Sequence, residues 1–291
     1  MGGRIAGRII EAGHTVVGLD IDPERAAAIG ATPAASVADV ARRADVVLLS
    51  LPDSRAVETV ALGGDGLVAH GREGQIVVDL STAAPASTRR LHAAFAERGV
   101  RLLDAGISGG AKAAELGTLT LMVGGAPEAL DELGWLLECF SEHVVHMGES
   151  GSGHTAKLLN NFLNGVSLAA TAEVMVAARK AGLDLEAFIN VLNVSSGMNF
   201  ATVNRFPHMI HGDYLEGGLT SRLMTKDLVL YVELLHELGV PTINASGPLA
   251  SFGLATNLGY DDQISNRVVD AIGDVAGGVR LHEPLPAEGR A

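Results

Sequence analysis

Short apolar runs alternate with helical segments through the first half of the chain. Continuous runs of this kind, bounded by Gly, Pro or Asp, are typical of buried strands, and the stretches between them repeat with helical periodicity. Strands separated by helices predict right-handed crossovers and a parallel sheet with both faces covered. The expected strands are 15–19, 46–51, 76–79, 101–104, 118–123 and 144–146, and the expected helices are 23–29, 36–43, 87–98 and 127–140.

The pattern changes after Gly148, where strand signals disappear. The remaining periodic segments are all helical, so we expect an α/β domain followed by an all-α domain. The predicted domains are 1–148 and 149–280, and the Pro-rich, polar residues 281–291 are expected to form a loose tail. The helices expected in the second domain are 155–181, 185–193, 220–238 and 247–258.

The first of these helices carries a polar stripe on an otherwise apolar segment. Lys157, Asn160, Asn161 and Asn164 follow one another at i, i+3, i+4 and i+7, which places them on one face. Burying a cation and amide groups on that face costs free energy unless they form hydrogen bonds or ion pairs, or take part in a reaction. Interhelical hydrogen bonds and a reaction site are both open interpretations.

Composition narrows the class of protein. The 291 residues are 47% hydrophobic and carry a net charge of −13, without a Lys/Arg cluster, so neither nucleic acid nor an anionic membrane is an expected partner. Cys139 is the single cysteine, which favours a reducing compartment. With neither a signal pattern nor a membrane-length apolar run, we expect a cytoplasmic location. Histidine spacing gives no metal motif.

The first twenty residues resemble the later part of a dinucleotide-binding unit. A helix ends at Gly13, a strand follows, and Asp20 stands at the strand's end, where such an acid bonds the ribose 2′-hydroxyl and favours NAD over NADP. Gly2 can serve only as the third glycine of G-x-G-x-x-G. Because the first strand and two glycines are absent, we expect weak NAD binding, or a true start about a dozen residues upstream. Asp20 as an ordinary turn residue is the alternative.

Three further segments bear candidate chemistry. Thr82 follows a strand, at the edge where open α/β sheets bind ligands. Ser108, Gly109 and Gly110 form a loop whose backbone amides can converge on a carboxylate, although a plain tight turn is the alternative. Lys226 and Asp227 are adjacent in a later helix, where an ordinary surface ion pair would contribute little.

Taken in order, these segments resemble the β-hydroxyacid dehydrogenase family, which includes 3-hydroxyisobutyrate dehydrogenase and tartronate semialdehyde reductase. The resemblance runs from Met1 to about Asp270. It implies a Rossmann-type doubly wound sheet domain, a helical domain that forms homodimers or homotetramers, and NAD, with NADP the less expected cofactor.

The resemblance also implies residue roles. Lys157 matches the family's catalytic lysine, the general acid and base. The residues that match substrate-binding positions are Ser108, Gly109, Gly110 and Asn161. Those that match cofactor-binding positions are Gly2, Asp20, Leu51, Pro52, Thr82, Lys226 and Asp227.

The implied reaction is hydride transfer between a nicotinamide and a small β-hydroxy acid, which is oxidised to a semialdehyde or keto acid. Two other readings stay open: an imine reductase, against which Lys157 argues, and a non-catalytic scaffold, which the missing glycines favour. The acid itself is not specified by the residues expected around it, which are Met198, Asn199, Phe200 and Leu219.

Overall fold

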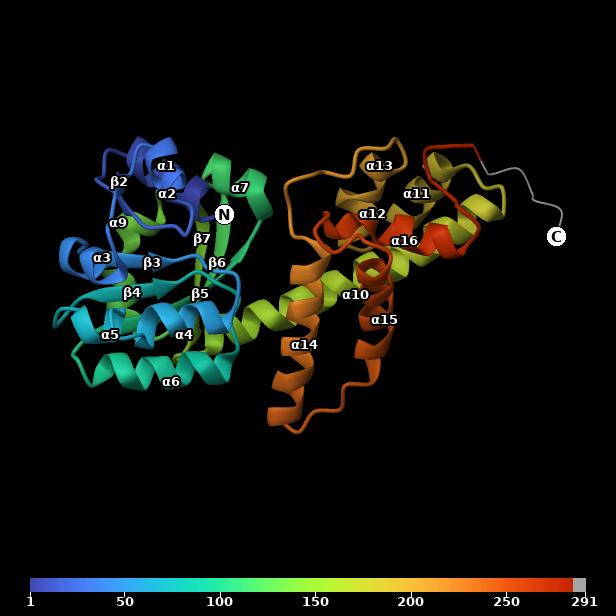
Figure 1. The fold of residues 1–291 in the computed structure, drawn as a ribbon. Helices are drawn as coiled ribbons and strands as arrows, with labels where there is room; N and C mark the ends of the chain where they lie inside the picture. The colour runs from blue at the N-terminus through green and yellow to red at the C-terminus, as the bar shows by residue number, and fades with distance from the viewer. Residues whose placement is uncertain (285–291) are drawn as a thin grey trace. The chain divides into compact units, whose positions relative to one another are not determined.

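The computed structural model describes residues 1–284, so only part of the expected tail at 281–291 lies within the described residues. The chain divides into two compact units, Met1–Leu158 and Leu159–Ala291, here called the α/β unit and the helical unit (Figure 1). Each unit is described by itself.

The α/β unit contains two sheets. The first pairs β1 (Val17–Gly18) with β2 (Thr32–Pro33) in parallel. The second has five strands in the order β3-β4-β5-β6-β7. Within residues 1–284, β3 pairs only with β4, so the single sheet expected from the pattern is split between β2 and β3. The strands of the larger sheet are β3 (Val46–Leu49), β4 (Ile76–Asp79), β5 (Arg101–Ser108), β6 (Leu119–Gly124) and β7 (Ser141–Gly148).

Strand direction departs from the prediction at one place. Strands β3, β4 and β5 are parallel, but β6 is antiparallel to β5, and β7 is parallel to β6. The physical reason is the short connection 109–118, because a parallel crossover needs a dozen or more residues. The same strand β5 runs on to Ser108, beyond the predicted end at residue 104.

Helices cover both faces of the five-stranded sheet (Figure 1). Alternate residues of β4 enter different cores: Ile76 and Val78 pack with α1, while Val77 packs with α4 and α6. This two-residue alternation with apolar side chains on both faces is the pattern of a central strand. The helices of the unit are α1 (Gly2–Glu11), α2 (Pro23–Ala28), α3 (Val37–Arg43), α4 (Ser54–Leu62), α5 (Leu67–His70), α6 (Pro85–Ala96), α7 (Gly110–Leu116), α8 (Pro127–Asp131) and α9 (Gly134–Leu137).

The single helix predicted over 127–140 is wrong. The segment forms two short helices, α8 and α9, and α8 ends at Asp131. Buried Leu133 and Leu137 pack into the sheet core, and Gly134, a poor helix former, stands at the break. Packing against the sheet therefore overrides the helical periodicity of the segment.

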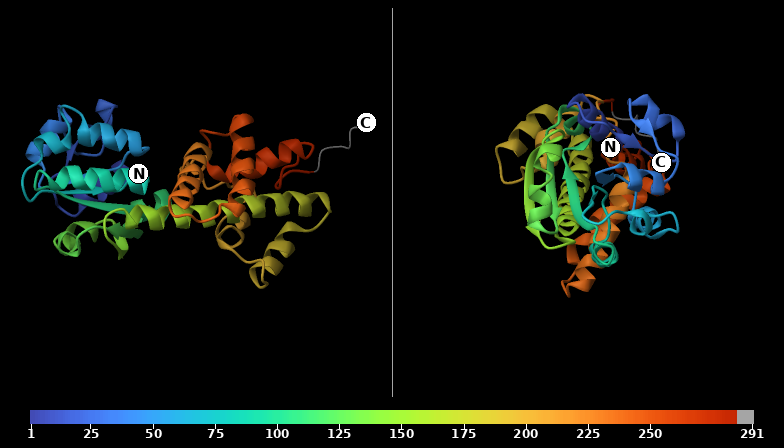
Figure 2. Two further views of the ribbon diagram at one scale, coloured as in Figure 1. Left: turned by 90° about the horizontal axis from the view of Figure 1, so that it is seen from below. Right: turned by 90° about the vertical axis from the view of Figure 1, so that its left-hand side faces the viewer.

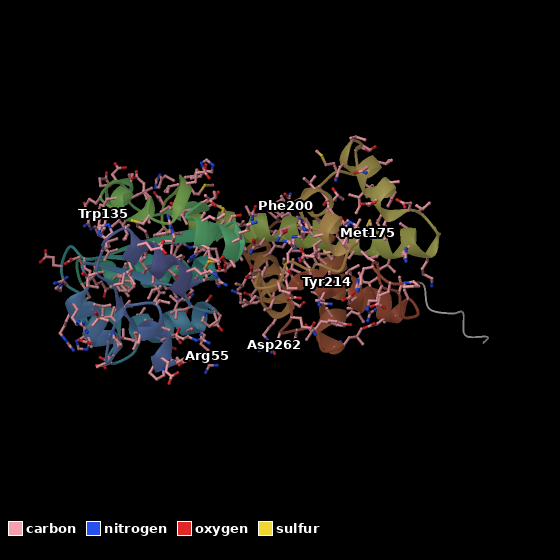
Figure 3. The ribbon with its side chains drawn as sticks, turned by 90° about the horizontal axis from the view of Figure 1, so that it is seen from above. Arg55, Trp135, Met175, Phe200, Tyr214 and Asp262 are labelled. Carbon is pink, nitrogen blue, oxygen red and sulfur yellow. The ribbon has the colours of Figure 1, made fainter. Side chains whose placement is uncertain are left out.

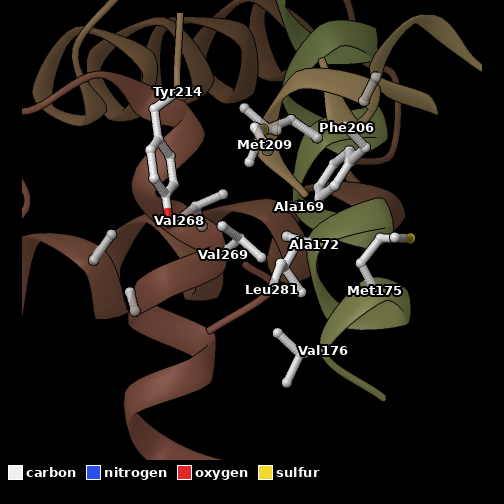
Figure 4. Packing of buried hydrophobic residues seen from close by; sticks show 14 of the residues in the cluster. Ala169, Ala172, Met175, Val176, Phe206, Met209, Tyr214, Val268, Val269 and Leu281 are labelled. Atoms are coloured by element: carbon white, nitrogen blue, oxygen red, sulfur yellow. The ribbon is translucent and has the colours of Figure 1, made fainter. Parts of the chain in front are cut away.

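The helical unit is built along α10 (Ser152–Lys180), which also provides the last turns of the α/β unit (Figure 2). Helices α14 and α15 lie side by side. The core of the unit gathers Met175, Phe206, Met209 and Val268 from three helices, α10, α13 and α16 (Figure 4). The other elements are α11 (Leu185–Asn193), α12 (Phe200–Asn204), α13 (Phe206–Met209), α14 (Ser221–Glu237), η1 (Ile243–Ala245), α15 (Ser246–Asn257), η2 (Ser265–Arg267) and α16 (Val268–Val275).

Candidate active site

The start of α10 is packed directly on the backbone of the sheet. Gly153 lies so close to β5 that a Cβ atom there would be 2.5 Å from the carbonyl oxygen of Asp104. The Asp104 side chain, fully buried, then caps the helix: Oδ1 accepts from Gly151 N at 2.7 Å and Oδ2 from His154 N at 2.8 Å. A carboxylate at this position also compensates the positive end of the helix dipole. The first turn of α10 is therefore fixed to β5.

One turn further, Lys157 lies against the same strand. A Cβ atom on Gly106 would be 2.5 Å from Cβ and 3.1 Å from Cγ of Lys157, so only glycine leaves room for the lysine there. Lys157 is half-buried. Its side chain therefore leaves α10 beside the strand that ends, two residues later, at Ser108.

The loop at 108–110 has a backbone conformation that favours glycine. Gly109 and Gly110 have φ of +121° and +72°, a region that side chains rarely adopt. Both glycines are exposed, and Gly110 begins α7. The loop thus presents backbone amides at the carboxyl end of β5, where a carboxylate could be bound.

His154 is fixed inside the α/β unit. The ring is 0% exposed, its Nε2 donates to the carbonyl oxygen of Asp79 at 3.2 Å, and its Nδ1 hydrogen-bonds Thr88 Oγ1 at 2.7 Å. These contacts connect the start of α10 to β4 and α6. The histidine is structural in this arrangement.

The predicted cofactor residues lie along the carboxyl edge of the sheets. Gly2 opens α1, and a Cβ atom there would be 3.1 Å from Cβ of Ser50, so glycine lets the helix approach the end of β3. Among the described residues no side chain caps α1, which leaves its first amides available to an anion. Asp20 follows β1, and its Oδ1 accepts from Asp22 N at 3.0 Å.

The ends of β3 and β4 are joined by hydrogen bonds. Leu51 N donates to Ser81 Oγ at 2.9 Å, and Ser81 N donates to Asp79 Oδ1 at 2.9 Å. Exposed Pro52 and half-buried Thr82 come next in the two chains. An acid after β1, an uncapped helix start and a hydroxyl at the strand ends are part of what a dinucleotide requires at such an edge, so these residues fit NAD.

The remaining predicted site residues belong to the helical unit. Asn161 Nδ2 on α10 donates to Asp227 Oδ2 on α14 at 2.5 Å, and Lys226 Nζ is 3.2 Å from Asp227 Oδ1. Asp227 is 2% exposed, so this is not an exposed surface pair. The interhelical hydrogen bond left open by the sequence is therefore present, and it orients the Asn161 amide.

Two residues of this arrangement were not singled out from the sequence. Asp104 and Gly106 lie in the same strand as the 108–110 loop, but neither belongs to a motif. An acidic residue and a glycine inside a buried strand are both unusual, and that is the one signal the sequence offered.

Comparisons with known proteins agree with this geometry. Residues 1–148 match the family model of the NAD-binding domain of 6-phosphogluconate dehydrogenase, and residues 151–270 match the model of the NAD-binding region of NADP-dependent 3-hydroxyisobutyrate dehydrogenase. The chain is 37% identical over 273 residues to an NAD-dependent L-serine dehydrogenase of Pseudomonas aeruginosa, covering 90% of this chain and 91% of the relative. The chain belongs to the β-hydroxyacid dehydrogenase family.

Two further relatives extend the comparison. A 2-(hydroxymethyl)glutarate dehydrogenase of Eubacterium barkeri is 33% identical, over 90% of this chain and 89% of the relative. The solved 3-hydroxyisobutyrate dehydrogenase of Mycobacterium tuberculosis with L-serine is 29% identical, with a TM-score of 0.83 over 92% of this chain and 94% of that one. Imine reductases share 17–18% identity, which shows the fold alone.

The family assignment confirms several predictions. The fold is a Rossmann-type α/β domain followed by a helical domain, and the protein is an NAD(P)-dependent oxidoreductase, not a non-catalytic scaffold. NAD is supported as the cofactor. Within residues 1–284, none of the helices has the length and apolar character needed to span a membrane.

Proposed function

We propose that this β-hydroxyacid dehydrogenase oxidises the hydroxyl group of a small β-hydroxy acid, with Lys157 as the general base and, in the reverse direction, the general acid. The observation that carries the proposal is the contact of Lys157 with Gly106. It fixes the amine-bearing side chain beside the strand that ends in the 108–110 loop. A proton-transfer group and a carboxylate-binding loop are thereby supplied by one strand–helix pair.

The geometry supports a proposed role for each residue. Ser108, Gly109 and Gly110 bind the substrate carboxylate through backbone amides and the Ser108 hydroxyl. Asn161, one turn after Lys157 on α10, positions the reacting oxygen. Lys157 Nζ takes the hydroxyl proton during oxidation and returns it during reduction. The nicotinamide, when bound, supplies the hydride chemistry.

The cofactor is proposed to lie along the edge defined by Gly2, Asp20, Leu51, Pro52 and Thr82. Asp20 would bond the 2′-hydroxyl of the adenosine ribose, because a carboxylate accepts from a hydroxyl and repels a 2′-phosphate. Lys226 and Asp227 are proposed to act at the same cofactor from α14. Asp227 holds both Asn161 and the Lys226 ammonium group, so it can order the two together.

The proposal extends to assembly. A homodimer or homotetramer formed through the helical unit would cover large apolar side chains that the unit exposes, among them Leu163, Val194 and Ile243. Exposed apolar side chains of this size are typical of protein contact surfaces when they gather in patches.

Lys157→Met tests the proposed chemistry. We expect kcat for hydroxy-acid oxidation to fall by a factor of about 100 to 10,000, the usual contribution of an acid–base group, while NAD binding measured by fluorescence titration is kept. Lys112→Met, which removes a lysine from α7 in the same unit, is the control. Turnover by the Lys157 variant within a few-fold of the wild type would rule out the assignment.

A further inference from the structure

His154 has a buried polar ring that the proposed reaction does not use. The side chains of Arg55 and Trp135 lie at the surface of the α/β unit (Figure 3), whereas the ring of His154 is 0% exposed. A buried imidazole loses the hydration of both ring nitrogens, which costs free energy unless hydrogen bonds replace it. Both nitrogens have such a bond, one to Asp79 and one to Thr88, so the ring joins three elements of the unit.

The partner of each ring nitrogen determines its role. The carbonyl oxygen of Asp79 can only accept, so Nε2 carries a proton and donates it across 3.2 Å. In the neutral ring, Nδ1 then accepts from the Thr88 hydroxyl, 2.7 Å away. The carboxylate of Asp79 is not the partner of Nε2, because its Oδ2 lies 4.0 Å away. The ring is therefore bonded to the backbone of the strand.

The backbone that Nε2 holds leads to the proposed cofactor residues. Asp79 is the last residue of β4, and its Oδ1 accepts from Ser81 N at 2.9 Å. Ser81 Oγ accepts in turn from Leu51 N at 2.9 Å, and Thr82 follows Ser81 directly. Leu51 and Thr82 are two of the residues proposed to contact the cofactor. The histidine is thus bonded to the carbonyl group three residues before Thr82.

The same residue also fixes the helix turn that precedes Lys157. The backbone N–H of His154 donates to Asp104 Oδ2 at 2.8 Å, which attaches the first turn of α10 to β5. Lys157 is three residues later, about one turn further on the same helix face. Its side chain packs on Gly106 of β5. One residue is therefore bonded both to the strand end of the proposed cofactor site and to the attachment of the helix that carries the proposed base.

We infer that His154 is a positioning residue, whose Nε2–H holds the end of β4 at a fixed distance from the helix turn that leads to Lys157. This inference rests on the proposed function. Oxidation breaks the C–H and O–H bonds of one alcohol group as the C=O bond forms; the hydride reduces NAD, and the proton passes to Lys157 Nζ. The base and the cofactor-binding strand must therefore be aligned on two adjacent atoms, and a misplacement of about 1 Å can cost about a hundredfold in rate.

A purely structural role is the competing explanation, in which the ring only fills its space and stabilises the fold. His154→Gln and His154→Asn separate the two, because both put an uncharged amide group at this position. The longer glutamine side chain places its amide nitrogen where Nε2 lies, and it can donate to the Asp79 carbonyl oxygen. The shorter asparagine side chain reaches only the position of Nδ1, beside Thr88. If His154→Asn does not fold, His154→Leu, which fills the space without a donor, replaces it.

The first measurement is the oxidation of 3-hydroxyisobutyrate and of L-serine with NAD by the full chain. We expect kcat to fall by about a hundredfold in His154→Asn and to stay within about tenfold of the wild type in His154→Gln. KM for the hydroxy acid should change little, because neither variant removes a group that contacts it. Equal kcat in the two variants would overturn the inference.

Thr88→Val is the matched control for stability. It removes the hydroxyl that Nδ1 bonds, in a residue that is 1% exposed, and leaves the bond to Asp79 in place. We expect a lower melting temperature, because a buried acceptor is left unsatisfied, with kcat within about threefold of the wild type. A loss of kcat in Thr88→Val as large as that in His154→Asn would show that stability, and not position, is what the ring provides.

Hydrogen exchange in the absence of NAD tests the bond without turnover. In His154→Asn the Asp79 carbonyl oxygen loses its donor, so the amides of Leu80 and Ser81 should exchange at least about tenfold faster, the effect of one lost buried hydrogen bond. His154→Gln and Thr88→Val should leave both amides near the wild-type rate.

The exchange pattern also separates this inference from the proposed reaction. If the wild type oxidises neither acid, or if Lys157→Met keeps its turnover, the proposed function fails, and the exchange rates then decide the inference by themselves. Faster exchange in His154→Asn alone would support it. Equal exchange in all four proteins would contradict it.

Discussion

Two glycines in the α/β unit determine where Lys157 lies although they have no side chain of their own. Gly106 leaves the space that Cβ and Cγ of Lys157 fill, and Gly153 lets the backbone of α10 approach the carbonyl oxygen of Asp104. The lack of a side chain at these two positions thus leaves the space that Lys157 and its helix occupy. This contribution depends on which atoms lie opposite each glycine, and only the tertiary structure shows those atoms.

Gly106→Ala tests this placement. The new Cβ would lie 2.5 Å from Cβ of Lys157, so the lysine and its helix turn must move. A misplacement of about 1 Å at a reacting group can cost about a hundredfold in rate, and we expect a loss in kcat of that order. Stopped-flow and steady-state rates, with circular dichroism as the check of folding, measure it.

The control for this change is Gly134→Ala. A Cβ atom at Gly134 meets no other atom within 4 Å, so kcat should stay near the wild-type value. Equal kcat in both alanine variants would show that the contact at Gly106 does not position the lysine.

Candidate site residues with reactive or polar groups could be identified from the sequence. A lysine and amides on an apolar helix, and a Ser-Gly-Gly loop after a strand, stand out because burying them needs a reason. The structure brings Lys157 and the loop at 108–110 to the same strand.

At the scale of elements, the attachment of the first turn of α10 to β5 fixes the helix that carries Lys157. Both oxygens of Asp104 accept backbone N–H groups from the turn that begins the helix. A carboxylate is required for this double role, since an amide side chain can accept with only one of its two polar atoms.

Asp104→Asn should therefore destabilise the fold. The amide group would place a donor against one backbone N–H, leaving it buried and unsatisfied, and we expect a loss of about 1–3 kcal/mol in the free energy of unfolding. Urea denaturation measures the loss, and hydrogen exchange at the amides of Gly151 and His154 locates it.

A matched substitution shows whether the geometry is the cause. Asp184 caps α11 through a single bond to Ala187 N at 2.7 Å, and asparagine is as good a cap as aspartate in that position. Asp184→Asn should thus leave stability nearly unchanged. A similar loss in both variants would mean that charge, and not the paired bonds, stabilises the start of α10.

Most elements were predictable, and the exceptions have physical causes. Periodicity located α10, α11, α14 and α15 within a few residues, because long amphipathic patterns are strong signals. It failed at 127–140, where the residues pack on a sheet in two short helices. The parallel sheet that it predicted is wrong at β6, which runs antiparallel to β5 because the 109–118 connection is short.

At the scale of the whole molecule, the two units are proposed to serve different tasks. We propose that Asp20 in the α/β unit selects the cofactor, and that the helical unit contributes to the choice of substrate. If that division holds, each preference can be changed without the other.

Asp20→Ala examines the first task. Loss of the carboxylate removes the partner of the 2′-hydroxyl and leaves Arg25, whose guanidinium lies 3.8 Å from Asp20 Oδ1, able to bind a 2′-phosphate. We expect the ratio of kcat/KM for NADP over NAD to rise by about tenfold or more, with no change in the preference among hydroxy-acid substrates.

Asp22→Ala is the companion variant. Asp22 also pairs with Arg25, but it caps α2 by accepting from Glu24 N. We expect a loss of stability without a change in cofactor preference. If both variants shift the cofactor ratio equally, Asp20 has no special role at the ribose.

The sequence alone predicted most of the strands and the longest helices, the change from α/β to helical structure, and the family. These depend on periodicity and on short motifs, which are local properties of the chain. Only the tertiary structure decided that β6 reverses direction, that Gly106 gives Lys157 its place, and that His154 is bonded to the end of β4. Those facts depend on which distant residues come into contact, and contacts of that kind leave no pattern along the chain.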